Sequence, residues 1–229
     1  MHVRGSGDVG EVGDAGQTRE ATIAFVDIVQ FTSLTDVHGD RVAADAATAL
    51  EQMARHQDDA DARLIKATGD GVLLEFSAPL IALRQIARII EGVHDLGLEA
   101  RAGVDHGAVI VRQQDVFGRT VNLAARLAAV AEPGAIAMTR SVALVAGEAG
   151  LSVTPMGPVT VRGLRDRIEV FVVDPCAHDG QWLRDPVCGM RLNAEDAVRI
   201  GGPGDSDLGF CSQRCAEIYT AEPEAFGTV

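Results

Sequence analysis

The sequence predicts an α+β fold, a ferredoxin-like split βαβ sheet with helices on one face and further strands after it. The first observation is the apolar run at residues 22–32, whose β-branched and aromatic residues are typical of a strand buried on both faces. The second is the order of the following segments, which combines amphipathic helices with a hairpin and more strands. The third is that all four cysteines lie beyond residue 175, which predicts a separate small module.

Local signals place each element in turn. The Asp70-Gly71 pair lies between two apolar runs and therefore predicts a hairpin. Pro79 suits the first turn of a helix, and Pro133-Gly134 ends another. The predicted elements are, in order, a strand (22–32), a helix (42–56), a hairpin (63–76), a helix (79–97), a strand pair around His106-Gly107 (99–112), a helix (118–131), a strand (135–138), a short helix from 139, and strands at 151–156, 159–162 and 168–173.

The composition limits the classes of function. The chain has 229 residues, of which 47% are hydrophobic, enough for one medium domain and a small one. Its formal net charge of −13 argues against a nucleic-acid partner, which would need a basic patch. No apolar run approaches a membrane span and no signal core is visible, so we expect a cytoplasmic protein without membrane contact. Residues 1–19 are rich in Gly and Asp and are predicted to be disordered.

Asp27 is the one carboxylate within the apolar run at 22–32. An ionised carboxylate in a buried strand is costly unless it is paired, hydrogen-bonded or bound to a metal. If the hairpin tip lies beside the end of this strand, Asp70 joins Asp27, and a cation between them best explains the pair. Carboxylates without Cys or His suit Mg²⁺ or Mn²⁺ acting on substrate phosphates. Taken alone, this segment favours turn chemistry as the explanation of Asp70.

A second group of polar residues lies on the helix predicted at 118–131. Asn122 and Arg126 are four residues apart and therefore share a face, while their alanine and leucine neighbours would pack inward. The guanidinium of Arg126 is a planar, permanently charged fork that suits phosphate oxygens. The alternative is a solvated arginine with an incidental asparagine beside it.

Four motifs in order carry a resemblance to a known family: FVDIVQFT, IKATGDGVLLEF, RAGVDHG and DVFGRTVNLAAR. With the closing segment GPVTVRGLRDRIEVFVV, they closely resemble the class III nucleotidyl cyclases. The resemblance covers about residues 18–174 and implies a cyclase catalytic domain at 20–174. Each motif is short, but four of them in the family's order are specific.

The resemblance implies a role for each matching residue. The set comprises metal-binding Asp27, Ile28 and Asp70, purine-reading Lys66 and Asp115, ribose-orienting Asn122, and Arg126, which stabilises the transition state. It also implies two Mg²⁺ or Mn²⁺ ions per active site and a head-to-tail homodimer. In such a dimer one subunit supplies the metal residues and its partner supplies the other four.

The base-reading pair and one departure from the family pattern bear on the activity. Adenine offers a donor at its amine and an acceptor at N1, so a carboxylate at Asp115 and an ammonium at Lys66 favour ATP over GTP. Gln30 stands where the family usually has glycine, in the turn where backbone amides approach the triphosphate. This substitution puts the rate in question more than the activity.

The C-terminal cysteines follow a metal-ligand pattern. Cys188 in DPVCGM and the pair Cys211 and Cys215 in FCSQRC indicate soft-metal binding rather than a disulfide, with ordinary reduced thiols as the alternative. These motifs resemble the YHS domain, a small treble-clef-like module, here at 184–229 after a linker at 175–183. The resemblance implies that the three cysteines bind Zn²⁺ or Cu⁺. The candidates for a fourth ligand are Cys176, His178 and Asp185.

The sequence therefore predicts a soluble adenylate cyclase that converts ATP to 3′,5′-cyclic AMP and pyrophosphate at a homodimer interface. We expect metal binding to the C-terminal module to regulate the cyclase. The alternative is that this module is a structural tail or a docking site for another protein. The other reading of the whole chain is a non-catalytic nucleotide-binding or metal-sensing signalling protein. His38, His56 and His94 are predicted to be surface or core residues, and His106 to be structural.

Overall fold

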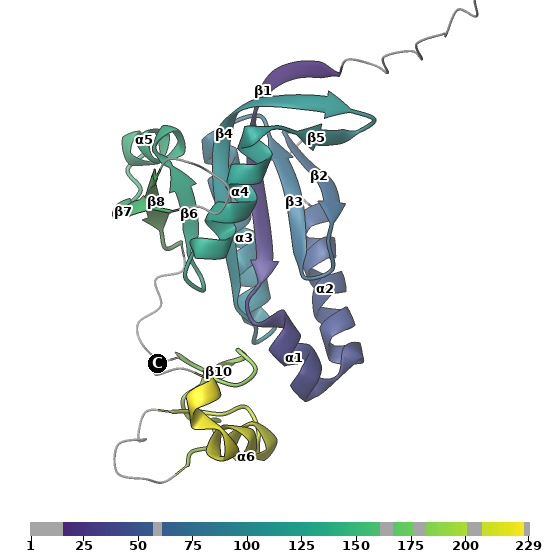
Figure 1. Ribbon diagram of the computed structural model, residues 1–229, viewed down its shortest axis with the longest axis vertical. Helices are drawn as coiled ribbons and strands as arrows, with labels where there is room; N and C mark the ends of the chain where they lie inside the picture. The colour runs from purple at the N-terminus through teal and green to yellow at the C-terminus, as the bar shows by residue number, and fades with distance from the viewer. Residues whose placement is uncertain (1–15, 57–60, 161–166, 176–181, 201–207, 227–229) are drawn as a thin grey trace, which may run out of the picture.

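The computed structural model describes residues 16–56, 61–160, 167–175, 182–200 and 208–226. Its main domain is built on one eight-stranded sheet with the order β2-β3-β1-β4-β6-β8-β7, and β5 pairs with β4 (Figure 1). The strands are β1 (Gln17–Ile28), β2 (Ala62–Ala67), β3 (Gly71–Phe76), β4 (Ala100–Arg112), β5 (Asp115–Phe117), β6 (Ile136–Thr139), β7 (Thr154–Val159) and β8 (Ile168–Val173). The helices are α1 (Phe31–His38), α2 (Asp40–Arg55), α3 (Pro79–Asp95), α4 (Arg119–Val130) and α5 (Arg140–Glu148).

Helices cover both faces of this sheet, whereas the sequence predicted them on one face. On one face α2, α3 and α5 pack against strand residues such as Ala24 and Val26. On the other face α4 packs against Ala21 and Ile23 of the same strand. Alternate residues of β1 thus belong to two separate cores, because successive side chains of a strand point to opposite faces. Figure 1 shows α4 in front of the sheet and α3 behind it.

Gly103 of β4 allows α4 to lie directly on the sheet. A Cβ atom at this position would lie 2.1 Å from both the carbonyl oxygen of Ala124 and the backbone nitrogen of Ala128. Both atoms belong to the backbone of α4 and cannot rotate away. The absence of a side chain at Gly103 therefore fixes the position of the helix that carries Asn122 and Arg126.

We expect Gly103→Ala to lower the free energy of unfolding by about 3 kcal/mol, because the added methyl group forces α4 away from the sheet. Chemical denaturation followed by circular dichroism measures this change. The matched control is Gly147→Ala in α5, where nothing lies within 4 Å of the added Cβ atom, and no loss of stability is expected. Equal stability of the two variants would contradict the close-packing argument.

The strand pair predicted around His106-Gly107 is wrong, because β4 is one continuous strand. It pairs antiparallel with β1 from Gln17↔Val111 to Ile28↔Ala100, so the hydrogen bonds of the sheet carry it past the glycine. The reversal comes later, at Gln113 and Gln114, which have positive φ values of 48° and 73°. The same pairing makes Gln17–Arg19 part of β1, although the sequence predicted disorder up to residue 19.

Other elements agree more closely with the sequence. The helices predicted at 79–97 and 118–131 and the strand at 168–173 are confirmed as α3, α4 and β8. The first helical region forms two helices, because Gly39 between them has a φ of 88° that few other residues adopt. One strand, β7, replaces the two that were predicted at 151–156 and 159–162, and residues 161–166 lie outside the described part of the chain.

A small C-terminal module packs beside α1 (Figure 1). It consists of a hairpin of β9 (Trp182–Arg184) and β10 (Arg191–Asn193), the helix α6 (Gln213–Ala221) and a 3-10 turn (Pro223–Phe226). Its small core includes Val187, Phe210 and Ala216, and Val37 of α1 is part of the same cluster. Among the described residues, no helix combines the length and apolar character needed to cross a membrane.

Candidate functional site

The two predicted metal aspartates meet at one end of the sheet. Asp27 lies opposite Gly71 in the β1–β3 pairing, and the backbone N–H of Ile28 donates to the carbonyl of Asp70 at 2.9 Å. Figure 1 shows the end of β1 and the β2–β3 turn on the same side, above α1. Asp70 is exposed, and Asp27 is partly buried. The structure therefore brings together two carboxylates that are 43 positions apart in the chain.

Arg101 of β4 is the partner that the buried position of Asp27 requires. Its Nε and Nη2 atoms donate to the two carboxylate oxygens of Asp27 at 3.2 and 3.3 Å. Its Nη1 atom donates to the carbonyl of Ala129 at 3.2 Å and so connects the carboxylate to the end of α4. The sequence analysis did not identify Arg101, because 74 residues separate it from Asp27 and only the β1–β4 register shows the contact.

Burial and charge have opposing effects on Asp27. Burial raises the pKa of this carboxyl above 3.8, the hydrogen bonds and charge of Arg101 lower it, and the nearby carboxylate of Asp70 raises it. A bound cation would reverse the effect of Asp70 by separating the two negative charges. Two oxygen ligands at an accessible end of a sheet fit a hard divalent ion. The side chain of Ile28 lies in the core at 3% exposure, so only its backbone could contact such an ion.

Lys66 of β2 and Asp115 of β5 lie in contact, although the two strands do not pair in the sheet. The ammonium of Lys66 is 2.8 Å from one carboxylate oxygen of Asp115 and 3.2 Å from the other. The hydrogen bond from Lys66 lowers the pKa of Asp115 below 3.8, and the backbone N–H of Val116 adds to this effect. Both side chains are partly exposed, which leaves a charged donor and a charged acceptor side by side at the surface.

Asn122 and Arg126 project from α4 away from the buried side of that helix. The inward face, which includes Leu123 and Leu127, is buried, whereas Asn122 is exposed and Arg126 is partly exposed. Within the described residues, no acidic group forms an ion pair with Arg126. The outer face of α4 therefore presents an amide and a cation, and the cation has no acidic partner in the described part of the chain.

Comparison with known proteins assigns the main domain to a protein family. Residues 14–175 match the profile of the adenylate and guanylate cyclase catalytic domain. The chain belongs to this family. The match begins at the β1 region and ends where β8 leaves the sheet, so it covers the main domain and not the C-terminal module. We refer to the matching part as the cyclase domain.

Curated relatives agree with this assignment. The pH-sensitive adenylate cyclase MT1302 of Mycobacterium tuberculosis (strain CDC 1551 / Oshkosh) is 34% identical over 161 residues, which are 68% of this chain and 41% of the relative. An adenylate cyclase of Streptomyces coelicolor is 34% identical over 125 residues, which are 52% of this chain and 32% of the relative. The chain thus spans less than half the length of these relatives.

Solved structures confirm the α+β cyclase fold. The adenylyl cyclase CyaB from P. aeruginosa matches with a TM-score of 0.61 and 20% identity, over 69% of this chain and 94% of that one. The catalytic core of a rhodopsin-guanylyl cyclase with converted specificity, in complex with ATPαS, has a TM-score of 0.60 and 19% identity, over 70% and 98%. At this level of identity the likeness shows the fold alone.

A cluster of potential soft-metal ligands lies where the C-terminal module meets the cyclase domain. The Sγ atom of Cys211 is 3.5 Å from Cys188 Sγ, from Cys215 Sγ and from His38 Nε2. All four ligand atoms lie within 4.8 Å of one another. The sulfur distances are far longer than the ~2.05 Å of a disulfide bond, so the three predicted cysteines are reduced thiols in contact.

His38 was not expected in this cluster: the sequence predicted an ordinary surface or core residue, whereas the structure places its Nε2 atom among the potential ligands. It is the last residue of α1 in the cyclase domain, 150 positions before Cys188, and no ligand spacing in the sequence connects them. Of the predicted candidates for a fourth ligand, Asp185 accepts backbone N–H groups from Val187 and Cys211 at 2.8 and 2.7 Å. Cys176 and His178 lie outside the described residues.

His106 and His94 form hydrogen bonds within the cyclase domain, as expected for structural residues. His106 shares a 2.9 Å hydrogen bond with Thr22 on the neighbouring strand, which accounts for its position in β4. His94 lies 2.9 Å from Glu99. Neither belongs to the metal-ligand cluster among the described residues.

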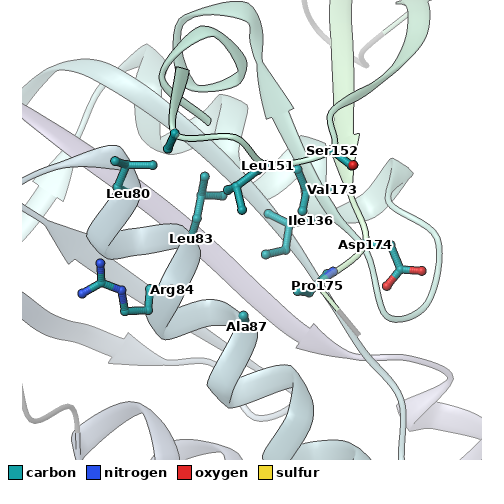
Figure 2. Close-up of a pocket in the computed structure, with 11 residues that line it drawn as sticks. Leu80, Leu83, Arg84, Ala87, Ile136, Leu151, Ser152, Val173, Asp174 and Pro175 are labelled. Carbon is teal, nitrogen blue, oxygen red and sulfur yellow. The ribbon is translucent and has the colours of Figure 1, made fainter. Parts of the chain in front are cut away.

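A pocket of about 470 Å³ lies elsewhere, between α3 and the strands β6 and β8 (Figure 2). Its lining is mainly apolar, with Arg84 and Asp174 as charged members. None of the predicted site residues lines it, and nothing in its lining resembles a phosphate site.

Proposed function

We propose that this protein is an adenylate cyclase that converts ATP to 3′,5′-cyclic AMP and pyrophosphate. The observation that carries the proposal is the meeting of Asp27 and Asp70 at one end of the sheet within a cyclase-family domain. The adenylate cyclase names of the curated relatives support the same reaction. In this reaction the ribose 3′ oxygen forms a bond to the α-phosphorus, and the bond from that phosphorus to pyrophosphate breaks.

Each group of residues has one task in this reaction. Asp27 and Asp70, with the backbone of Ile28, would hold two Mg²⁺ or Mn²⁺ ions, which supply charge stabilisation at the attacking oxygen and the triphosphate. Binding these ions requires the carboxylate of Asp27 to share its contacts with Arg101. Arg126 meets negative charge that develops on the phosphoryl oxygens, and Asn122 orients the ribose.

The contact between Lys66 and Asp115 supports ATP as the preferred substrate. Adenine needs a carboxylate for its amine and a donor for N1, and the two charged groups already lie 2.8 Å apart. Guanine offers the reverse pattern on this edge and would leave both charges without a partner, at a cost of about 1–3 kcal/mol each. The pair thus discriminates between the two bases through hydrogen-bond polarity.

We expect the double substitution Lys66→Glu with Asp115→Cys to lower the ratio of ATP to GTP turnover by about 100-fold, because two hydrogen-bond matches are lost. The measurement is kcat/KM for each nucleotide. Arg140→Glu with Glu169→Cys is the matched control, since these two residues form another exposed ion pair, between α5 and β8. An unchanged ratio in Lys66→Glu with Asp115→Cys would remove these residues from base selection.

We also propose that two copies of the chain form a head-to-tail homodimer with shared sites. Asn122 and Arg126 face outward from their own subunit, which suits a role in the site of a partner. Exposed apolar side chains at Ile110 and Phe117 are cross-strand neighbours on the β4–β5 arm and offer further area for contact. Closed dimers are the commonest form of soluble homo-oligomer.

We propose further that the C-terminal module is of the YHS type and that its metal state regulates the cyclase. A hairpin with Cys188 at its turn and a helix with Cys211 and Cys215 at its start support a treble-clef-like arrangement. Because this module contacts α1, metal binding in the module can affect the position of α1 and, through it, the active site. Equal cyclase activity with and without the soft metal, across a range of ATP concentrations, would refute the regulatory role.

One incubation tests the proposed reaction. The full chain is mixed with ATP or GTP and Mn²⁺ or Mg²⁺, and the products are separated by chromatography. Cyclic AMP and pyrophosphate in equal amounts are the expected result. If no cyclic nucleotide forms under any of the four conditions, the protein is a non-catalytic signalling protein and not an enzyme.

A further inference from the structure

We propose that His38 and the three cysteines together bind one Zn²⁺ ion, so that the metal fastens the C-terminal module to helix α1 of the cyclase domain. The ligand set joins residues from two domains. Cys188, Cys211 and Cys215 come from the module, and His38 is the last residue of α1. The metal site therefore belongs to the interface and not to the module alone.

The geometry of the four atoms fits a tetrahedral zinc ion. With zinc–sulfur bonds of about 2.3 Å, the sulfur atoms of a tetrahedron lie about 3.8 Å apart. The measured distances from Cys211 Sγ to the two other sulfur atoms and to His38 Nε2 are all 3.5 Å. Three thiolates and one imidazole form a common structural zinc set, and four ligands leave no position open. Small adjustments of the side chains are enough to admit the ion.

The surrounding hydrogen bonds hold the ligands in place without competing for the metal. The fully buried carboxylate of Asp185 accepts the backbone N–H groups of Val187, Cys188 and Cys211 at 2.8, 3.3 and 2.7 Å. This arrangement fixes the turns that present two of the cysteines. Such supporting contacts orient metal ligands and increase affinity. Asp185 is thus a positioning residue for the proposed zinc site.

The module contacts both ends of α1. At the far end His38 joins the cysteines, and at the near end Gln30 reaches the loop that holds Cys188. The Nε2 atom of Gln30 donates to the carbonyl of Pro186 at 3.4 Å. A Cβ atom on Gly189 would lie 2.4 Å from Gln30 Oε1, so this loop accepts the glutamine only because residue 189 is glycine.

This contact gives Gln30 a role that explains its departure from the cyclase pattern. Gln30 has a left-handed backbone, with φ of 55° and ψ of 33°, a conformation usually occupied by glycine. Its side chain packs against the module, and its Oε1 atom is buried without a hydrogen-bond partner among the described residues. The turn that follows Asp27 and the helix α1 are therefore held by the module at two points. A zinc ion at the second point would restrict the motion of the segment nearest the catalytic aspartates.

Zinc binding by full-length variants tests the proposal without any measurement of cyclase activity. Competition with a chromophoric chelator gives the affinity, and the absorption of the Co²⁺-substituted protein reports the ligand set. We expect one ion per wild-type chain and at least about 100-fold weaker binding in His38→Asn, with an altered Co²⁺ spectrum. His38→Cys should restore tight binding, because four cysteines also form a zinc site. His56→Asn, at an exposed histidine outside the cluster, should bind as the wild type does.

Hydrogen exchange of the same proteins shows which segment zinc binding stabilises. Zinc should slow exchange of the α1 amides in the wild type and in His38→Cys, and leave them unchanged in His38→Asn. Two results would overturn the proposal. One is wild-type zinc affinity with an unchanged Co²⁺ spectrum in His38→Asn. The other is loss of binding in Cys176→Ser or His178→Asn, which would place the fourth ligand on the preceding segment. Neither result depends on whether the protein is a cyclase.

Discussion

Asp27→Asn is expected to reduce cyclic AMP formation by about 10³-fold, because removal of one charged ligand costs several kcal/mol of transition-state stabilisation. The substitution keeps the size of the side chain, and its amide oxygen can still accept one of the two hydrogen bonds from Arg101. Asp70→Asn should show a similar loss, since the two carboxylates meet at the same end of the sheet. The measurement is kcat with Mn²⁺ and with Mg²⁺ over a range of ion concentrations.

A control separates loss of the site from loss of the fold. Asp45→Asn removes an exposed carboxylate from α2, where it belongs to neither the sheet nor the hairpin that carries the two aspartates, and should leave kcat unchanged. The thermal midpoint of Asp27→Asn should remain close to that of the wild type. Wild-type activity in either Asp27→Asn or Asp70→Asn would rule out the two-metal proposal.

Arg126→Ala is expected to lower kcat by about 10³-fold, with little change in KM, because an arginine that meets transition-state charge contributes about this much. Arg126→Lys should be intermediate, since the charge remains but the planar fork is lost. Arg41→Ala on the exposed side of α2 is the matched control and should retain full activity. Steady-state kinetics with ATP distinguishes the three.

Mixing the two inactive variants tests the shared site. If Asp27 and Arg126 act from different subunits, half of the dimers in an equal mixture have one site that is intact, which restores about a quarter of wild-type activity. If both residues act within one subunit, no site in the mixture is intact and no activity returns. The outward orientation of Arg126 on α4 favours recovery.

Local signals in the sequence were sufficient for elements that depend on nearby residues. Pro79 predicts the start of α3, and Pro133-Gly134 predicts the end of α4. The Asp70-Gly71 turn was also correct, since the hairpin β2–β3 forms around it. His106-Gly107 was misread as a turn, because a glycine within a strand looks the same as a glycine at a bend. The long pairing with β1 decided that question, and residues far along the chain supply it.

Some residues of the candidate sites could be found from the sequence, and others only from the tertiary structure. Family motifs were enough to nominate the metal aspartates, the base-reading pair, Asn122 and Arg126. They did not reveal Arg101, whose contact with Asp27 depends on strand register, or His38, whose contact with Cys211 depends on how the module docks.

The sequence alone determined the order of the elements, the cyclase motifs and the cysteine spacing, because each of these is a pattern over a few neighbouring residues. The tertiary structure decided that α4 covers the second face of the sheet, that Gln30 packs on Gly189, and that His38 completes the cysteine cluster. Packing between segments that are not adjacent in the chain sets these three features, and no local pattern of charge or hydrophobicity encodes such contacts.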